Sequence, residues 1–282
     1  MCFPYLDRGW KAALAFTAAL TIQAGMIRAD ERMLRVCADP NNLPFSNDKG
    51  EGFENKIVEM LALELNARPV YTWRAQRRGF LRETLKAGAC DLVPGYSTHV
   101  HGVRTTRPYY RSAYVFVSRA GRAGVASFDD PELKLLRIGV QLIGDEGVNT
   151  PPVASLIKRG IVANLRGYHL YADYRQPNPP ARIIDAVANG EVDVAVAWGP
   201  LAGYFAARSV TALRLAVVQP LADGPKSPMA FDVSMAVRKD DAVLAAEISA
   251  VLERRRSDVD AILASYGVPR VEAVPPAHEA AQ

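Results

Sequence analysis

The residues best suited to metal chemistry are the histidines, of which the chain has four. His99 and His101 form a His-x-His pair, a spacing that can present two imidazoles to one zinc ion. A zinc site needs at least one further protein ligand, and His169 and His278 are remote in the sequence. We therefore predict no metal site and interpret the histidine pair as part of a surface loop.

Acidic side chains are the next candidates, because a carboxyl group can act as a general acid or base. Glu51, Glu54 and Asp91 are available, but the sequence pairs none of them with a nucleophile. The chain also lacks a G-x-S-x-G elbow, a phosphate-binding P-loop and the glycine fingerprint of dinucleotide-binding folds. The sequence thus predicts a binding protein that is not an enzyme and uses no cofactor.

The third reactive set is three cysteines, Cys2, Cys37 and Cys90. Cys2 lies in a segment that we expect to be removed on export, which leaves two cysteines in an oxidising compartment. Cys37 and Cys90 each lie in an apolar run that is typical of a strand, LRVCAD and CDLVPG. Adjacent strands would bring them together, so we predict a Cys37–Cys90 disulfide, with two buried free thiols as the alternative.

The amino terminus has the layout of an export signal, with a short basic start, an apolar run at 12–22 and small residues beyond it. We expect residues 1–29 to be removed by cleavage after Ala29, with cleavage after Ala24 as the alternative. An uncleaved anchor is the competing interpretation, but this apolar run is shorter than the roughly 20 residues that cross a bilayer. The sequence therefore predicts an exported, periplasmic protein with no membrane-spanning segment.

Net charge narrows the range of partners. The full chain carries a formal charge of +4, and loss of three basic residues and one acidic residue with the signal lowers it to +2. Nucleic-acid binding requires basic residues gathered in a patch or stripe, so a nearly neutral chain argues against it. Small polar ligands and protein partners remain, and a chain of this length can form two lobes.

Beyond Met33, short apolar runs alternate with longer amphipathic segments, which is typical of parallel sheets covered by helices. We expect strands at 34–39, 69–73, 90–95, 137–144 and 192–198. We expect helices at 55–66, 78–88, 151–159, 181–189, 240–255 and 257–266. The predicted fold class is α/β, with two lobes that each contain a doubly wound sheet.

Two extended segments, YVFVSR at 114–119 and FDVSMAVRK at 231–239, are best suited to carry the chain between the lobes. We interpret them as hinge strands. The predicted layout is a first lobe at 30–118, a second lobe at 119–230, a return segment to the first lobe at 231–270 and a disordered tail at 271–282.

Several sequence strings resemble those of known proteins. LRVCADPNNLPFSNDKGEGFENKIVEML, LKAGACDLVPGYST and RPYYRSAYVFVSR together resemble the type II periplasmic solute-binding fold. RVCADPNNLPFSN, YTWRAQRRGF, RPYYRSAYVFV, NTPP and WGPLAGYFA are similar to the solute-binding-like proteins associated with quinoprotein methanol dehydrogenases, the MoxJ and XoxJ type. The similarity extends from Leu34 to Pro269.

This resemblance implies a periplasmic accessory of a methanol or alcohol dehydrogenase that uses pyrroloquinoline quinone (PQQ). It implies no catalytic residues, and it favours recognition of the dehydrogenase through the cleft between the lobes. The alternative is the substrate-binding receptor of an ABC importer for a small polar or aromatic solute.

The resemblance also implies where a ligand or partner would bind, because open α/β sheets form binding sites at the carboxyl ends of their strands. Four segments of this chain are expected there. The candidate cleft residues are Asp39, Asn41, Asn42 and Phe45 in the first, Tyr96, Ser97 and Thr98 in the second, Asp145, Asn149 and Thr150 in the third, and Trp198 in the fourth.

Alternatives stay open for two of these segments. Residues 39–42 could form an ordinary Asx turn with no contact to a ligand. In the third segment Thr150 can cap a helix and Pro151 suits its first turn, which would leave backbone amides free for an anion. Asp145 and its neighbour Glu146 bring negative charge to the same place, which would compete with an anionic ligand.

The resemblance further implies that two charged contacts of amino-acid receptors are missing. Such receptors place an arginine three residues after a threonine, where this chain has His101 after Thr98. They place an acid near the strand end that here carries Trp198. Arg104 or Arg107 could substitute for the arginine, but we interpret both as surface or interlobe residues.

A free amino acid is therefore a poor ligand candidate for this cleft. Trp198, Tyr96 and Tyr204 instead suggest an aromatic-lined cleft that could accept an apolar group or a side chain of a partner. Packing within a lobe is the alternative, and we favour it for Tyr204.

Overall fold

The structure is a computed structural model that describes residues 32–98, 101–122, 124–143, 149–169, 173–225 and 227–272. All of these belong to one compact unit that begins at Arg32. The predicted signal at 1–29 and the part of the predicted tail at 273–282 lie outside the described residues.

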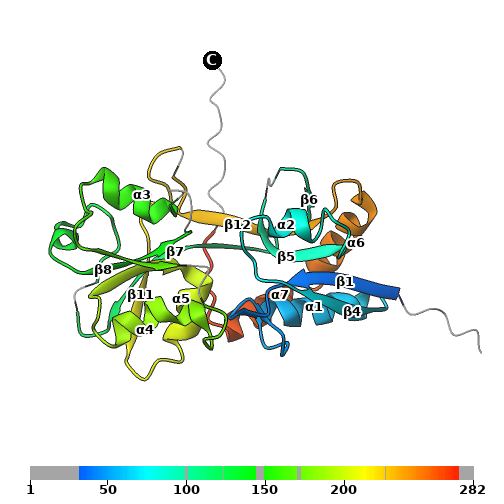
Figure 1. Ribbon diagram of the computed structural model, residues 1–282, viewed down its shortest axis with the longest axis horizontal. Helices are drawn as coiled ribbons and strands as arrows, with labels where there is room; N and C mark the ends of the chain where they lie inside the picture. The colour runs from blue at the N-terminus through cyan, green and yellow to red at the C-terminus, as the bar shows by residue number, and fades with distance from the viewer. Residues whose placement is uncertain are drawn as a thin grey trace, which may run out of the picture. The chain divides into compact units, whose positions relative to one another are not determined.

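The first lobe is built on three parallel strands, β1 (Arg32–Ala38), β4 (Ala67–Trp73) and β5 (Leu92–Ser97). β1 lies between the other two. Helices α1 (Phe53–Glu64), α6 (Ala242–Arg254) and α7 (Arg256–Ser265) cover one face of this sheet, and the short α2 (Phe80–Glu83) lies on the other (Figure 1). A small hairpin of β2 (Asn41–Asn42) and β3 (Ser46–Asn47) follows β1 and places its polar residues at the carboxyl end of the sheet.

The predicted disulfide between Cys37 and Cys90 is confirmed. Cys37 lies in β1 and Cys90 lies just before the neighbouring β5, and the two Cα atoms are 5.6 Å apart. Both residues are fully buried beside Phe80 and Leu85. The disulfide therefore lies in the small apolar cluster on the α2 face of the first lobe.

The helix predicted at 78–88 is wrong in its length, because α2 covers Phe80–Glu83 only. Gly79 precedes it in the left-handed region at φ 83°, and Thr84 leaves the helical region at φ −120°. The Thr84 hydroxyl donates to the Phe80 carbonyl at 2.6 Å, a local bond of the kind that competes with helix continuation. Phe80 and Leu85 still point inward, but from a short helix and a turn.

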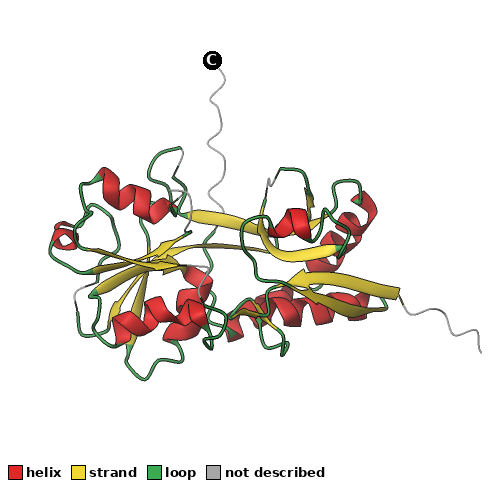
Figure 2. Ribbon diagram, in the orientation of Figure 1, coloured by secondary structure: helices red, strands yellow, loops and turns green. Residues whose placement is uncertain are grey.

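The second lobe contains the strands β8 (Ile138–Leu142), β9 (Leu165–His169), β10 (Val194–Trp198) and β11 (Leu213–Val217). One face packs against α3 (Pro151–Lys158) and the 3-10 turn η1 (Pro131–Lys134). The other face packs against α4 (Arg182–Ala188), which follows the 3-10 turn η2 (Pro179–Ala181), and α5 (Gly199–Ala206). Figure 2 shows these helices on either side of the strands. β9, β11 and α5 are not among the elements predicted from the sequence.

Two long strands, β7 (Tyr110–Arg119) and β12 (Ala230–Val237), connect the lobes. They pair with each other from Tyr110–Val233 to Ala113–Ala230. Past this stretch β7 pairs with β10 and β11 of the second lobe, and β12 pairs with β5 and the short β6 (Arg104–Thr105). The two predicted sheets are thus halves of one curled sheet in the order β4-β1-β5-β12-β7-β10-β8-β9.

This pairing locates the crossing between lobes at 110–113 and 230–233. The predicted hinge segment 114–119 lies inside the second-lobe sheet, and most of the predicted segment 231–239 lies in the first lobe. The residue limits proposed for the lobes remain predictions.

A second connection between the lobes joins α5 to the turn after α7. The rings of Tyr204 and Tyr266 stack with centroids 5.6 Å apart, and the Ser112 hydroxyl donates to the Pro269 carbonyl at 2.5 Å. Gly203 and Gly267 lie in close backbone contact there. The interpretation of Tyr204 as packed within one lobe is therefore incomplete, because Tyr266 belongs to the first.

Candidate binding cleft

Two adjoining cavities lie between the lobes at the carboxyl ends of the strands. The first, of about 290 Å³, is lined by Asp39, Asn41, Asn42, Phe45, Gln76, Arg77, Gly95, Tyr96, Ser97, Gln141, Tyr174, Pro179, Pro180, Trp198 and Leu201. We name it the capped cavity, because the second-lobe segment 173–180 covers it.

The second cavity, of about 300 Å³, is lined by Asn42, Phe45, Glu54, Gln76, Gly95, Ser97, Tyr110, Tyr114, Gln141, Trp198, Phe231 and Val233. We name it the hinge cavity, because β7 and β12 form one of its walls.

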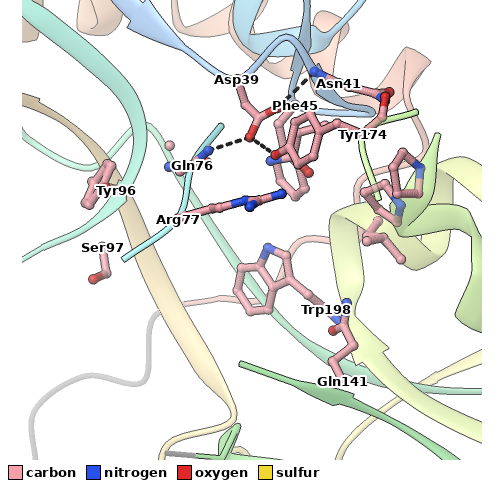
Figure 3. Close-up of a pocket in the computed structure, with 15 residues that line it drawn as sticks. Asp39, Asn41, Phe45, Gln76, Arg77, Tyr96, Ser97, Gln141, Tyr174 and Trp198 are labelled. Carbon is pink, nitrogen blue, oxygen red and sulfur yellow. Dashed lines mark hydrogen bonds between the residues drawn. The ribbon is translucent and has the colours of Figure 1, made fainter. Parts of the chain in front are cut away.

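Asp39 lies where β1 ends, and its carboxylate is fully engaged within the protein. One oxygen accepts a hydrogen bond from the backbone amide of Asn41 at 2.9 Å. The other accepts from the backbone amide of Gln76 at 2.6 Å and from the Tyr174 hydroxyl (Figure 3). Only 2% of Asp39 is exposed. The first of these bonds forms the Asx turn that is the alternative for this segment, so Asp39 shapes the cleft wall.

Segment 173–180 is held over the capped cavity by contacts between the lobes. Besides the Tyr174–Asp39 hydrogen bond, the Asn41 side-chain amide donates to the Gln176 carbonyl at 3.0 Å. The Arg77 guanidinium lies 5.2 Å from the centroid of the Tyr174 ring, a cation–π distance. In Figure 3, Arg77 extends between the Asp39 cluster and Trp198.

Trp198 is the last residue of β10 and lines both cavities. Its backbone amide donates to the Gln141 side-chain oxygen at 2.8 Å, which fixes the strand end. Its ring packs edge-on against Tyr114 and Phe231, with centroids 5.4 and 5.9 Å away. The indole is therefore held by neighbours on the hinge side and faces the space between the lobes.

The predicted residues at the carboxyl end of β5 and just beyond it divide into two groups. Tyr96 and Ser97 line the capped cavity, and Ser97 also lines the hinge cavity. Thr98 lines neither, because the chain turns away there and its amide donates to the Asp232 carbonyl at 3.3 Å.

Of the third predicted segment, Asn149 and Thr150 are described, and they line neither cavity. Thr150 begins α3 with Pro151 in its first turn, as expected, but its hydroxyl donates to the Gln141 carbonyl at 2.9 Å and caps nothing. Asn149 forms an isolated bridge with Leu142. Asp145 and the rest of 144–148 lie outside the described residues, so anion binding there stays a hypothesis.

No protein-family model matches the sequence. A search of curated proteins finds Protein MoxJ of Methylorubrum extorquens, strain AM1, which is 35% identical over 266 residues, covering 90% of this chain and 86% of the relative. Protein MoxJ of Paracoccus denitrificans is 29% identical over 273 residues, covering 90% of this chain and 95% of the relative. This chain belongs to the MoxJ family.

Solved structures agree with this membership. The MoxJ-family chain resembles the periplasmic binding protein XoxJ from Methylobacterium extorquens AM1 with a TM-score of 0.71 and 36% identity, over 86% of this chain and 100% of that one. It resembles MxaJ from "Methlophaga aminisulfidivorans" MPT with a TM-score of 0.71 and 25% identity, over 85% and 100%. An ancestral cationic amino-acid solute-binding protein, at 20% identity and a TM-score of 0.64, shares the fold alone.

These relationships establish the type II periplasmic binding fold and support a binding role and a periplasmic location for the MoxJ-family chain. Within the described ranges, no helix is both long and apolar enough to span a membrane. In the same part of the chain, no three His, Cys, Asp or Glu side chains are grouped to hold a metal ion. Of the predicted loop pair, His101 is exposed and His99 lies outside the described residues.

Several residues that line the cleft of this MoxJ-family protein are not among those predicted from the sequence. Gln76 and Arg77 follow the carboxyl end of β4, the kind of position where cleft residues were sought. Gln141 is a polar residue inside an apolar strand and is 3% exposed, which is itself a signal of a structural or binding role. Tyr174 follows no recognisable strand, so the sequence held no comparable signal for it.

Of the acids weighed for catalysis and the two arginines weighed as substitutes, only Glu54 lines either cavity. Arg104 donates to the Lys239 carbonyl and lines neither cavity, and Arg107 also lies outside both. Asp91, just before β5, forms ion pairs with Arg35 and Arg238 at 2.6 and 2.7 Å, so it belongs to an ion-pair network at the amino end of that strand. Of the two remaining acids, Glu51 lines neither cavity and Glu54 lines the hinge cavity.

Glu54 is the cleft acid with an unusual proton affinity. It lies in the first turn of α1, is 6% exposed, and its side chain packs against Gly95. Burial, and to a smaller extent the nearby Asp39 carboxylate, together raise the pKa of Glu54 to about 8. The cleft of this MoxJ-family protein therefore contains one acid, Asp39, that is bonded within the protein and one carboxyl group, that of Glu54, that is mostly protonated at neutral pH.

Proposed function

We propose that this protein is a non-enzymatic periplasmic accessory of a PQQ-dependent methanol or alcohol dehydrogenase, and that it recognises the dehydrogenase through the cleft between its lobes. The MoxJ-family membership and the resemblance of the sequence to proteins associated with quinoprotein methanol dehydrogenases support the partner. The proposed location is the periplasm, reached with the predicted signal at 1–29.

The observation that carries the cleft assignment is the position of Trp198. This side chain lies at the carboxyl end of β10, lines both cavities and is braced by Tyr114 and Phe231. A half-buried, braced tryptophan in a concave site is the typical anchor of a protein interface, because it offers a large contact area at a small entropic cost.

The chemistry of the cleft favours binding over catalysis. Of its two acids, Asp39 is saturated by internal hydrogen bonds. Glu54 has no serine, cysteine, histidine or lysine hydrogen-bonded to its carboxyl group among the residues that the structure describes. A nucleophile and base in mutual contact would be expected of a hydrolase.

A capture experiment tests the proposed partner and the anchor together. The purified protein, immobilised through its carboxyl terminus, is exposed to a periplasmic extract of a methanol-grown host or to purified quinoprotein methanol dehydrogenase. We expect wild type to retain the dehydrogenase and Trp198→Ala to bind it roughly 30-fold more weakly, since loss of an interface anchor costs about 2 kcal/mol or more.

Trp73→Ala is the matched control, because Trp73 lies on β4, stacks on Tyr71 and lines neither cavity. It should bind the dehydrogenase like wild type. Equal binding by Trp198→Ala and wild type would refute the cleft assignment, and no capture by wild type would refute the partnership.

A conventional importer receptor is the second candidate, and the size of the two cavities favours it, since about 300 Å³ suits a small solute. A solute present at a hundred times its Kd would stabilise the folded protein by about 2.7 kcal/mol. A thermal-shift screen of small solutes therefore separates the candidates. A clear solute hit together with no dehydrogenase capture would reverse the order proposed here.

A further inference from the structure

The hinge cavity is walled by aromatic rings that hold one another in place. Tyr114, Trp198 and Phe231 contact one another edge-on, with ring centroids 5.4 to 6.4 Å apart. They come from three strands, β7, β10 and β12, so the cluster includes both lobes. Phe45 and Tyr110 line the same cavity. Ring faces carry partial negative charge and attract cations at close range.

One acid, Glu54, lines this cavity. In the part of the chain that the structure describes, no side chain donates a hydrogen bond to its carboxyl group or forms an ion pair with it, although Glu54 is more than nine-tenths buried. Gly95 provides the room for it: a Cβ at Gly95 would lie 2.0 Å from a Glu54 carboxyl oxygen. A buried carboxyl group without a protein partner is costly, so this one needs a proton or an external counter-ion.

The groups around Glu54 supply no counter-ion. Asp39 at the end of β1 is itself an acid, and it disfavours a negative charge on Glu54. Tyr71 on β4, Tyr110 on β7 and Tyr109 just before β7 also interact with Glu54, and burial raises the pKa of each phenol, so they stay neutral. Asp39 forms hydrogen bonds but no ion pair within the described ranges. The cation Arg77 lines the adjoining capped cavity but not the hinge cavity, so the hinge cavity itself is lined by one acid and several aromatic rings.

We propose that the hinge cavity binds an organic ammonium group on a slender apolar stem, with Glu54 as its counter-ion and the aromatic rings as its walls. The ammonium replaces the proton on Glu54, which leaves to solvent as the cation enters. Two sources offer this chemistry: a free alkylamine and a lysine side chain of a partner protein. The site is argued from this cavity alone and does not rest on the proposed dehydrogenase partnership.

Calorimetric titration of the full mature protein with n-butylammonium chloride tests the site, with sodium chloride at equal ionic strength as the blank. An amine with a pKa near that of lysine, about 10.4, stays charged at both pH 7 and pH 9. Because the pKa of Glu54 is about 8, we expect roughly tenfold tighter binding at pH 9 than at pH 7. Butan-1-ol, a neutral molecule of similar length, should bind more weakly and without this pH dependence.

Glu54→Gln should lose both the preference for the cation and the pH dependence. Glu51→Gln is the matched control, because Glu51 is exposed, lies three residues away and lines neither cavity. A second measurement needs no variant: at pH 7, titrations of wild type in buffers of different ionisation enthalpy should show release of close to one proton per bound n-butylammonium. Equal affinity for n-butylammonium and butan-1-ol, or binding without proton release, would overturn the proposal.

A lysine-containing peptide, acetyl-Gly-Lys-Gly-amide, distinguishes the two sources. Binding of this peptide with the same Glu54 dependence supports a lysine side chain, and binding of n-butylammonium alone supports a free amine. Dehydrogenase capture is measured on the same variants. If wild type captures the dehydrogenase but does not bind n-butylammonium, the ammonium site alone is overturned. If wild type binds n-butylammonium but does not capture the dehydrogenase, the proposed function alone is overturned.

Discussion

Gly203 in α5 lies very close to Gly267 after α7, and this contact predicts how Gly203→Ala changes the free energy of unfolding. A Cβ placed on Gly203 would lie 1.9 Å from the Gly267 carbonyl oxygen and 3.3 Å from Pro269. The Gly267 carbonyl oxygen belongs to the backbone, so it cannot move aside as the end of a flexible side chain could. Gly203→Ala can therefore fit only if α5 and the turn move apart.

Two effects of Gly203→Ala oppose each other. In a helix, alanine is favoured over glycine by about 1 kcal/mol. Overpacking of a tight contact typically costs about 1–3 kcal/mol, and a backbone overlap of this depth belongs at the upper end. We expect a net loss of about 2 kcal/mol in the free energy of unfolding, which corresponds to roughly 4–8 °C in Tm for a domain of this size.

Urea unfolding followed by circular dichroism measures this loss. Gly121→Ala is the matched control, because a Cβ at Gly121 would meet nothing within 4 Å, and its stability should stay within about 0.5 kcal/mol of wild type. If Gly203→Ala proves as stable as wild type or more so, the contact between α5 and the turn does not hold the lobes as the structure indicates.

Three further predictions concern the first lobe and the cleft. Replacing Cys37 and Cys90 by alanine should lower the free energy of unfolding by about 4 kcal/mol in the chain-entropy model, because 53 residues separate the bonded pair. Wild type should lose stability as the pH rises from about 4.5 to about 8, since the folded-state pKa of Glu54 is raised to about 8; Glu54→Gln should flatten this dependence. Tyr174→Phe removes the hydroxyl that bonds to Asp39, so the lobes should open further, seen as a larger radius of gyration in small-angle X-ray scattering.

Each of these has a control and a contrary result. Chemical unfolding of the cysteine variant should match that of the reduced wild type, and equal stability of the variant and the oxidised wild type would contradict the disulfide argument. For the pH series, Glu51→Gln should follow wild type; a Glu54→Gln variant with the same pH slope as wild type would show that Glu54 titrates normally. For Tyr174→Phe, an unchanged scattering profile would mean that the hydrogen bond to Asp39 does not hold the lobes together.

Most of the fold could be predicted from the sequence, because its parallel strands are short apolar runs with clear turn residues between them. Helices α1, α6 and α7 begin and end within two residues of their predicted limits. The region of α2 could not be predicted, because a glycine in the left-handed region and the Thr84 side-chain bond decide its length. The joining of the two sheets into one depends on pairing between β7 and β12, which are more than a hundred residues apart.

The cleft was only partly predictable. Asp39, Asn41, Asn42, Phe45, Tyr96, Ser97 and Trp198 line the cavities because each lies at or just beyond the carboxyl end of a strand or in the hairpin after β1. Thr150 does not, because its hydroxyl has an internal acceptor in the Gln141 carbonyl. Tyr174 could not be found from its neighbours in sequence, since it reaches Asp39 only when the two lobes meet.

Hydrogen–deuterium exchange of the protein with and without purified quinoprotein methanol dehydrogenase tests most directly whether the cleft recognises the partner. We predict slower exchange of backbone amides in segments 39–45, 76–77 and 198–201, which line the two cavities. The exposed surfaces of α3 and α6 should exchange at unchanged rates. Slowed exchange confined to α3, α6 or another surface away from the cavities would contradict the account.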